Sequence, residues 1–356
     1  MNSTCPFFVI GKTVCLSPVR IPFYFSLHQN MFGDIPDTYV ALGAPVLAFW
    51  LMSLMFYCLD ISGWRWLDKY RIHESEEVKS KNLATLWEVA RAVIFQNVMQ
   101  ALIGFAWLAE PPVISVARCQ SEMEGLGRTL VLVVRGLFGE ETGMKILEQW
   151  GPGMTHWLYW WVIPAAQIFF AMWVSFKIWL DLPLMSLPRF TVDTWQYFIH
   201  RLMHTNQYLY RKVHSVHHKL YVPYALGALY NHPFEALLMD TLGVIIAEQV
   251  THLSVRQTIF FLVYGMCKGV DDHCGYNFPF DPFQLISRSN SDYHDIHHQV
   301  CPFTTTCPRK QYLGGVQAVG IKSNFSQPHF IHWDVLLGTR MTREDIQKRG
   351  QKVKTT

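Results

Sequence analysis

The sequence predicts an all-α integral membrane protein in which about three to four transmembrane helices support a cytosolic helical cap. Three observations lead to this fold class. Of the 356 residues, 50% are hydrophobic and 15% aromatic, whereas only 16% are charged, against about 25% in an ordinary globular protein. The first half of the chain contains long stretches with almost no charge, which suit membrane-spanning helices. Eleven of the sixteen histidines, by contrast, lie in the second half, between positions 200 and 298.

Charge and cysteine usage exclude several other classes of protein. The formal net charge of +3 is small and spread along the chain, so we expect no nucleic-acid partner. The eight cysteines show no CxxC spacing, which argues against a zinc ribbon and a disulfide scaffold. The composition therefore favours a protein that lies in a lipid bilayer.

Residues 1–35 are expected to form a poorly structured N-terminal segment. Three prolines interrupt them, and they lack the apolar core and small-residue cleavage site of a signal peptide. Met31 is as good a start as Met1, so the sequence leaves the start of the protein open.

Residues 36–185 are expected to hold the transmembrane helices and their connecting loops. Three stretches are long enough to cross about 30 Å of hydrocarbon as helices. They cover residues 39–59, about 85–108 and 157–180, and the third opens with the aromatic run Trp-Leu-Tyr-Trp-Trp. For each stretch the alternative is a buried core helix, and it is strongest for the second, which carries Glu88 and Arg91.

The charges between these stretches predict the topology. The link 64–81 contains five Lys and Arg residues, and the positive-inside rule places it in the cytosol. Residues 111–156 would then be lumenal, and the histidine-rich region would be cytosolic. Two shorter apolar runs, 236–250 and 258–266, are typical of a re-entrant pair or of helices half-sunk in the membrane.

Residues 186–340 are predicted to form the catalytic domain, because they contain three histidine clusters with repeated spacing. Residues three and four apart share one face of a helix, so each cluster can direct two or three ring nitrogens at one point. Eight imidazoles are enough for two ions, so the cap is predicted to carry a histidine-rich di-metal site. The clusters are His200 and His204, then His214, His217 and His218, then His294, His297 and His298.

Two further histidines are candidate ligands, and four aspartates are candidate supports. His273 follows an apolar run, where we expect it to face the site, and His232 is a less certain ligand. Acidic side chains commonly orient metal-bound imidazoles by accepting their second N–H. The candidates for this role are Asp193, Asp271, Asp272 and Asp295.

The ligand type favours iron among the possible metals. Sites of nitrogen ligands without thiolate suit Fe, Cu, Ni or Zn. Zinc needs three or four ligands, and haem needs only one or two histidines. Two irons that activate oxygen account for the number of histidines, and no side chain beyond the ligands is then required as a catalytic group. A membrane metal transporter is the alternative, but it would place histidines and polar residues along the spans, which are nearly free of charge here.

The three histidine boxes, in this order and spacing, resemble those of the fatty acid hydroxylase superfamily of membrane di-iron enzymes. The surrounding sequence is similar to the fungal sphinganine 4-hydroxylase branch of that superfamily. The segments that carry the resemblance are 193–204, 214–224, 270–276, 293–299 and, near the first span, 70–77.

This resemblance implies a monooxygenase of the endoplasmic reticulum membrane that uses O₂ to hydroxylate carbon 4 of a sphingoid long-chain base or ceramide. Its electrons would come from NADPH through cytochrome b5 and its reductase, as separate partners. A sterol methyl oxidase or sterol desaturase of the same superfamily is the alternative. Members of the branch often carry Asn where His232 stands, and Asn277 replaces a histidine found in some lipid hydroxylases.

Residues 300–319 interrupt the stretch in which relatives run directly from His-His-Gln into Gly-Ile-Lys-Ser-Asn-Phe. The segment is rich in turn-forming residues and has no helical or strand period, so we expect an insertion of low order that the site does not need. Residues 341–356 are expected to form a cytosolic tail. Its Lys352 and Lys354 resemble a dilysine retrieval signal for the endoplasmic reticulum.

Overall fold

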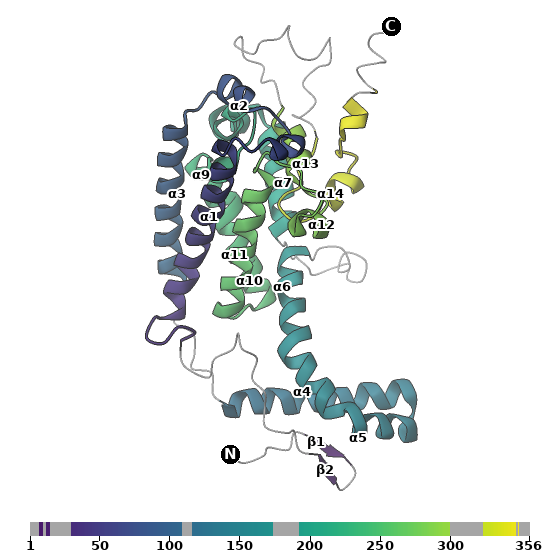
Figure 1. Cartoon of the computed structure of the whole chain (residues 1–356). Coiled ribbons are helices and arrows are strands. Elements are labelled where there is room, and N and C mark those ends of the chain that lie inside the picture. The colour runs from purple at the N-terminus through teal and green to yellow at the C-terminus, as the bar shows by residue number, and fades with distance from the viewer. Residues whose placement is uncertain are drawn as a thin grey trace. The chain divides into compact units, whose positions relative to one another are not determined.

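The structure, a computed structural model, describes residues 7–9, 12–14, 30–108, 116–173, 192–299, 323–346 and 348. Within these ranges every regular element is a helix except one short hairpin (Figure 1). In that hairpin β1 (Phe7–Val9) pairs antiparallel with β2 (Lys12–Val14), inside the segment expected to be poorly structured. The predicted all-helical character therefore holds for the described residues outside the hairpin.

The chain divides into two compact units. One comprises Met1–Val40, Leu108–Phe169 and Leu253–Gln257, and the other comprises Ala41–Trp107, Phe170–His252 and Thr258–Thr356. All the candidate site residues belong to the second unit.

The first unit contains two amphipathic helices, α4 (Val116–Phe138) and α5 (Glu140–Trp157), that the sequence analysis did not assign. They pack as an antiparallel hairpin because Gly139, with φ of 78°, adopts a left-handed turn between them. The expected third span continues from α5 through the π-turn η2 (Leu158–Val162) into α6 (Ile163–Trp173). Its remaining residues, 174–180, lie outside the described residues.

The second unit contains α1 (Asp37–Ile61) and α3 (Leu86–Trp107), which agree with two predicted spans to within two residues at each end. They are the two helices among the described residues that are long and apolar enough to cross a membrane. Phe49 and Phe56 of α1 pack in one core with Val89 and Val93 of α3. A short 3₁₀ turn, η1 (Arg65–Tyr70), and α2 (Ser75–Lys81) connect the pair.

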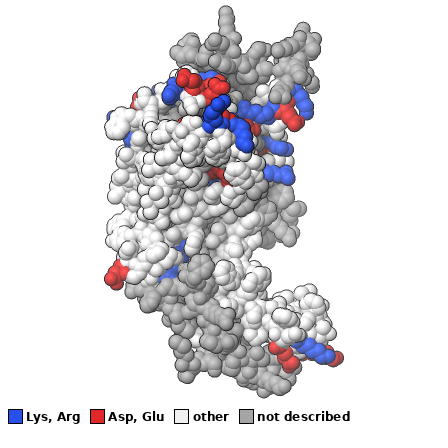
Figure 2. Space-filling model, viewed as in Figure 1, with Lys and Arg blue, Asp and Glu red and all other residues white. Residues whose placement is uncertain are grey.

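The surface of these two helices is apolar where it is exposed. Leu47 and Leu51 of α1 and Phe95 and Leu102 of α3 each expose more than half of their surface. Figure 2 shows few charged atoms over this part of the visible face, whereas Lys, Arg, Asp and Glu gather beyond its upper end. Such a surface suits lipid, because a monomeric soluble protein rarely exposes apolar patches of this extent.

The remaining helices of the second unit carry the histidines. The two shorter apolar runs are helical, as expected: the first forms a π-turn and α10, and the second lies within α11. The elements are α7 (Val192–Thr205), α8 (Gln207–Lys212), η3 (His214–Lys219), η4 (Ala225–Leu229), α9 (Pro233–Glu235), η5 (Ala236–Thr241), α10 (Leu242–Thr251), α11 (Val255–Asp272), α12 (Pro282–Ile286), α13 (Ser291–His298) and α14 (His332–Leu336).

Candidate metal centre

Nine buried histidines converge in two adjacent groups, and they are the nine that the sequence analysis selected as principal ligands. Within each group one nitrogen from every ring lies within 4.8 Å of the others. The first group is His200, His204, His214, His218 and His297, and the second is His217, His273, His294 and His298. The two groups touch, since the ring centroids of His218 and His298 are 4.9 Å apart. The fold therefore brings together residues separated by almost one hundred positions.

The second and third histidine boxes each divide between the two groups. The box at 214–218 forms a 3₁₀ turn, η3, and the box at 294–298 lies on α13. In each box the two histidines four residues apart enter one group, and the histidine between them enters the other. His217 and His297 are these intermediate residues, so each box contributes to both groups and couples their geometry.

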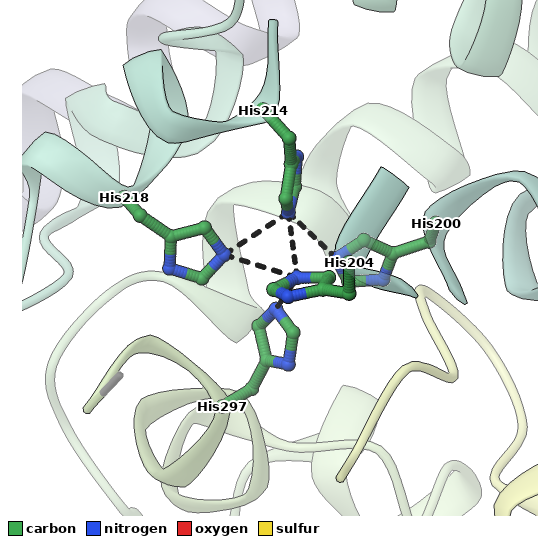
Figure 3. A group of neighbouring side chains, drawn as sticks. All are labelled: His200, His204, His214, His218 and His297. Atoms are coloured by element: carbon green, nitrogen blue, oxygen red, sulfur yellow. Dashed lines mark hydrogen bonds between the residues drawn. The ribbon is translucent and has the colours of Figure 1, made fainter. Parts of the chain in front are cut away.

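In the first group the ring nitrogens converge closely (Figure 3). The Nε2 atom of His214 lies 2.8 Å from that of His204, 3.0 Å from that of His218 and 3.1 Å from that of His200. The Nε2 atoms of His204 and His297 are 3.1 Å apart. Nitrogens about 2.1 Å from a shared ion and at right angles to each other lie about 3.0 Å apart, so these separations fit one first-row metal ion.

The second group has the same spacing with fewer rings. The Nε2 atom of His294 lies 2.9 Å from that of His273 and 2.9 Å from that of His298. The ring of His217 completes the group, with its centroid 4.5 Å from that of His298. Four nitrogens can hold an ion while leaving further coordination positions open.

The opposite ring nitrogen, Nδ1, is held by the surrounding backbone in five of the nine histidines. In each of these five rings the Nδ1 atom forms a hydrogen bond of 2.8–3.2 Å to a backbone carbonyl oxygen. The pairs are His200 with Phe325, His217 with Tyr230, His273 with Gly269, His297 with Ser323 and His298 with Leu220. A carbonyl oxygen only accepts, so the Nδ1–H of each ring donates. In a neutral ring the Nε2 atom then carries a lone pair.

These tautomers provide a test of whether a cation fits. The Nε2 atoms of His273 and His298 both carry lone pairs, and both lie 2.9 Å from the Nε2 atom of His294. A single proton on His294 can satisfy only part of this arrangement, whereas a metal ion satisfies all the lone pairs at once. The donor set therefore fits a metal ion in each group.

Burial keeps the imidazoles neutral. Loss of hydration lowers the pKa of His214 to about 3, and burial is also the largest cause that lowers the pKa of His217 to about 4 and of His297 to about 3. Mutual repulsion between the rings acts in the same direction for His204 and His218. At neutral pH the rings are therefore unprotonated at the metal-facing nitrogen, as ligation requires.

His232 and the four aspartates take other positions. His232 lies outside both groups and caps α9, where its Nδ1 accepts the backbone N–H of Phe234 at 3.2 Å. Asp193 accepts the backbone N–H groups of His329 and Phe330 at 3.2 and 2.8 Å.

The other three aspartates hold polar side chains in the described residues. Gln284 donates to Asp271 at 3.4 Å, Lys268 forms an ion pair with Asp272, and His73 and Arg343 bind Asp295. In these contacts the aspartates connect elements that surround the histidines, and their partners are not rings of either group.

The carboxylate that holds one of the nine rings was not among the residues predicted from the sequence. Glu235 is 3% exposed, and its Oε1 atom lies 2.6 Å from the Nδ1 atom of His214. Burial raises the pKa of Glu235 to about 7. The only available signal was its position in the Asn-His-Pro-Phe-Glu string, three residues after His232. Ser323 and Phe325 were not predicted either, because they act through backbone carbonyl groups, which residue type does not reveal.

A largely apolar cavity of about 460 Å³ lies between α1, α3 and η4. Its size falls within the range of ligand pockets, which is about 300–1,000 Å³. The wall formed by Tyr224 and Leu226 follows the second histidine box along the chain. All of its lining residues belong to the second unit, which also contains both histidine groups.

Comparisons with known proteins agree with this site. The fatty acid hydroxylase family model matches residues 185–339. The sphingolipid C4-hydroxylase SUR2 of Saccharomyces cerevisiae is 38% identical over 326 residues, which cover 91% of this chain and 78% of the yeast protein. Sphinganine C4-monooxygenase 2 of Arabidopsis thaliana is 33% identical over 316 residues, covering 89% and 92% of the two chains.

A very-long-chain aldehyde decarbonylase, GL1-9 of Oryza sativa subsp. japonica, is 31% identical over 317 residues, which cover 89% of this chain and 94% of the rice protein. No solved structure matches the chain. Apolar helices with two adjacent histidine groups define a class of helical membrane proteins with paired metal sites. Within that class, the chain belongs to the fatty acid hydroxylase family.

Proposed function

We propose that this chain is a sphingolipid C4-hydroxylase, a membrane di-iron monooxygenase that hydroxylates carbon 4 of a sphingoid long-chain base. Sphinganine or dihydroceramide would become the corresponding phyto- form. The observation that carries the proposal is the similarity of about nine-tenths of the chain to sphingolipid C4-hydroxylases. The histidine boxes by themselves indicate only the superfamily, whereas the similarity extends over the membrane helices as well.

The nine grouped histidines are the proposed ligands of the two irons. Iron is favoured because an all-imidazole set suits a redox-active first-row metal, and hydroxylation of an unactivated C–H bond requires redox chemistry. When bound, the irons would supply the activation of O₂. The chain's own residues fix ring tautomers through hydrogen bonds to Nδ1, exclude water from the buried nitrogens and position the lipid.

The overall reaction requires two electrons from outside the chain. One oxygen atom of O₂ enters the C–H bond at carbon 4 to form a hydroxyl group, and the other atom leaves as water. NADPH supplies the two electrons and a proton of the medium is consumed, so that NADP⁺ is the oxidised product. We propose cytochrome b5 and its reductase as the route of these electrons.

The apolar cavity between α1, α3 and η4 is a proposed place for the hydrocarbon chain of the substrate. Trp50, Leu54 and Trp87 are among the apolar residues that line the cavity, and Asp60 and Ser53 add polar groups. Such a lining can take up a long hydrocarbon chain from the bilayer without exposing the chain to water. The exposed apolar surfaces of α1 and α3 would allow the substrate to arrive from the bilayer.

The proposed location is the endoplasmic reticulum membrane, with the histidines facing the cytosol. The basic link 64–81 supports this orientation, because it connects α1 to α3 and carries the positive charges expected on the cytosolic side. A third membrane crossing near residues 157–180 belongs to the same proposal.

Expression of the full chain in cells that lack a sphingolipid C4-hydroxylase tests the activity. Mass spectrometry of the sphingolipids should detect bases with a third hydroxyl group at carbon 4. An inactive histidine variant such as His297→Ala provides the control at matched protein level. Absence of the phyto- bases, together with rescue of cells that accumulate methylated sterols, would instead support the sterol oxidase alternative.

A further inference from the structure

Four polar side chains form a cluster beside the first histidine group, and one of them, Glu235, also holds a ring of that group. The amide–carboxylate cluster comprises Gln96 of α3, Gln196 of α7, Glu235 of α9 and Asp240 of η5. The Nε2 atoms of Gln96 and Gln196 donate to the two carboxylate oxygens of Asp240 at 3.5 and 3.3 Å. The two amides therefore meet at one carboxylate although they come from different helices.

The position of Gln96 makes this cluster unusual. Gln96 is 2% exposed and lies on α3, one of the two helices that suit a membrane span. A buried polar side chain in such a helix is costly, and polar residues kept there commonly serve a function. The contact with Asp240 connects the span to the helices that hold the metal groups.

A local change of helix type brings the two carboxylates near each other. Residues five apart lie on different sides of an α-helix, but η5 is a π-turn, in which the hydrogen bonds run from i to i+5. Glu235 immediately precedes this turn, and Asp240 lies within it, five residues further along the chain. Such π-turns are frequent at functional sites.

Three oxygen atoms of the cluster have no hydrogen-bond partner among the described residues. They are Oε1 of Gln96, Oε1 of Gln196 and Oε2 of Glu235. Because the nitrogens of both glutamines face the carboxylate of Asp240, their oxygens are turned away from it. Buried polar atoms are rarely left unpaired, and all three of these are acceptors. The cluster therefore calls for a ligand that is rich in donors.

The cluster borders the first metal group directly. The other oxygen of Glu235, Oε1, holds the Nδ1 atom of His214 at 2.6 Å. Gln196 precedes His200 by one turn on α7. A ligand held by the free oxygens would thus lie next to the ligands of one ion.

We propose that the amide–carboxylate cluster binds the amino-diol head of a free long-chain base and makes the enzyme prefer it over the N-acylated base. This inference rests on the proposed function. The head of the free base carries one ammonium and two hydroxyl groups, so it brings five donor hydrogens and a positive charge to three free acceptors and two carboxylates. N-acylation removes the charge and two of these donors, and it adds a second chain beside the amine.

The site of oxidation supports the same placement. Carbon 4 is bonded to the hydroxyl-bearing carbon 3, and the amine-bearing carbon is the next along. The polar head must therefore lie near the metal centre when carbon 4 is oxidised, and the cluster lies beside the imidazole of His214, a proposed ligand of that centre.

The test compares two substrates in membranes that contain the full chain and its electron donors. For each variant, kcat/KM for carbon-4 hydroxylation is measured with sphinganine and with its N-acylated counterpart. The wild-type protein should prefer the free base. Gln96→Leu and Gln196→Leu, which keep the side-chain size, should each lower this preference about tenfold, mainly through the KM for the free base. The ratio of the two substrates cancels differences in the amount of folded enzyme.

Asn97→Leu is the matched control, because Asn97 is the buried polar neighbour of Gln96 on the same helix and forms no side-chain hydrogen bond to the described residues, Asp240 included. It should leave the substrate ratio unchanged. An unchanged ratio in both glutamine variants would overturn the inference and would mean that the free oxygens bind only water. A wild-type preference for the N-acylated base, or an equal loss in Asn97→Leu, would also overturn it. If the wild type forms no carbon-4 product from either substrate, the proposed function fails and the inference with it.

Discussion

At the scale of single residues, the tautomer of each imidazole decides whether it can hold a metal. A backbone carbonyl on the Nδ1 side fixes the proton there and leaves Nε2 free, as for His200 with Phe325 and for His297 with Ser323. Glu235 has the same role for His214, but its carboxylate also makes the ring a stronger ligand. Removal of a ring and removal of its support should therefore have different consequences.

Removal of the intermediate histidine of either box should abolish hydroxylation without preventing membrane insertion. His217→Ala takes one of four ligands from the second group, and His297→Ala takes one of five from the first. Purified His217→Ala should lose about one of two bound ions per chain, as measured by elemental analysis. His232→Ala is the comparison, since His232 lies outside both groups and should leave the metal content unchanged. Full product formation by either His217→Ala or His297→Ala would contradict the ligand assignment.

Loss of the Glu235 support should weaken metal binding rather than eliminate it. Glu235→Ala leaves the Nδ1 atom of His214 without its partner, and changes of this kind lower metal affinity about 10- to 100-fold. Competition with a chelator on the purified protein measures the effect. Glu235→Gln retains an acceptor oxygen and should lie between the wild type and the alanine variant. Equal metal retention in all three proteins would show that the support is dispensable.

At the scale of elements, α2 and α13 are joined through His73. Its two ring nitrogens lie 2.6 Å from Glu77 on α2 and 2.8 Å from Asp295 on α13. Asp295 is also bound by Arg343, so side chains from two other parts of the chain hold α13. Because α13 carries three of the nine histidines, this bracing helps to fix both metal groups.

The His73 contact should make stability depend on pH. Burial lowers the pKa of His73, but the hydrogen bonds and charges of Asp295 and Glu77 outweigh burial and raise the pKa above 6.5. A raised pKa means that the stabilisation is fully present below about pH 6.5 and is lost as the pH rises through the folded-state value. The thermal midpoint of the wild type should exceed that of His73→Gln most at about pH 6, and the difference should narrow towards about pH 9.

The partner of His73 provides the control for this pH dependence. Glu77→Gln removes one of the two carboxylates that contact the ring. In a Glu77→Gln background, the effect of His73→Gln on the thermal midpoint should therefore still change with pH, but by less than in the wild type. A difference between the wild type and His73→Gln that stays constant with pH would show that His73 acts only through packing.

At the scale of the whole molecule, the metal centre depends on contacts between distant parts of the chain. The carbonyl groups of Ser323 and Phe325 reach rings on α13 and α7. These residues follow the expected insertion 300–319, which lies outside the described residues. Any change to the insertion must therefore preserve the segment that begins near residue 323.

Deletion of residues 300–319 should keep or raise hydroxylation, provided that Gly320 to Phe325 are retained. The reason is that a long turn-rich stretch after the last box adds no histidine, while the carbonyl groups needed by the site lie beyond it. Product mass spectrometry on the deletion variant measures this, and a deletion that also removes residues 320–325 should be inactive. A protein that folds but loses all hydroxylation after removal of 300–319 alone would contradict the prediction.

The sequence by itself determined the two spans within two residues, the helical character of the catalytic region and the nine histidines of the groups. These properties depend on the length of the apolar stretches and on the spacing of residues a few positions apart. Both can be read directly from the sequence. The resemblance to the fatty acid hydroxylase superfamily, which rested on the boxes and their surrounding strings, was confirmed by the family comparison. The amphipathic helices α4 and α5 were not predicted, because the stretch between the second and third spans was interpreted only as a loop.

Only the tertiary structure decided how the nine histidines divide and what supports them. Box spacing is compatible with several pairings, and the fold assigns the outer two histidines of the second and of the third box to one group and the histidine between them to the other. The support for His200 comes from a backbone carbonyl 125 residues away, and a carbonyl group is present at every position of a chain. Acidic residues near the boxes were the natural candidates from sequence, yet Glu235 holds His214, while Asp193 and Asp295 brace other elements. Long-range contacts of this kind depend on packing, and no local pattern of residues encodes them.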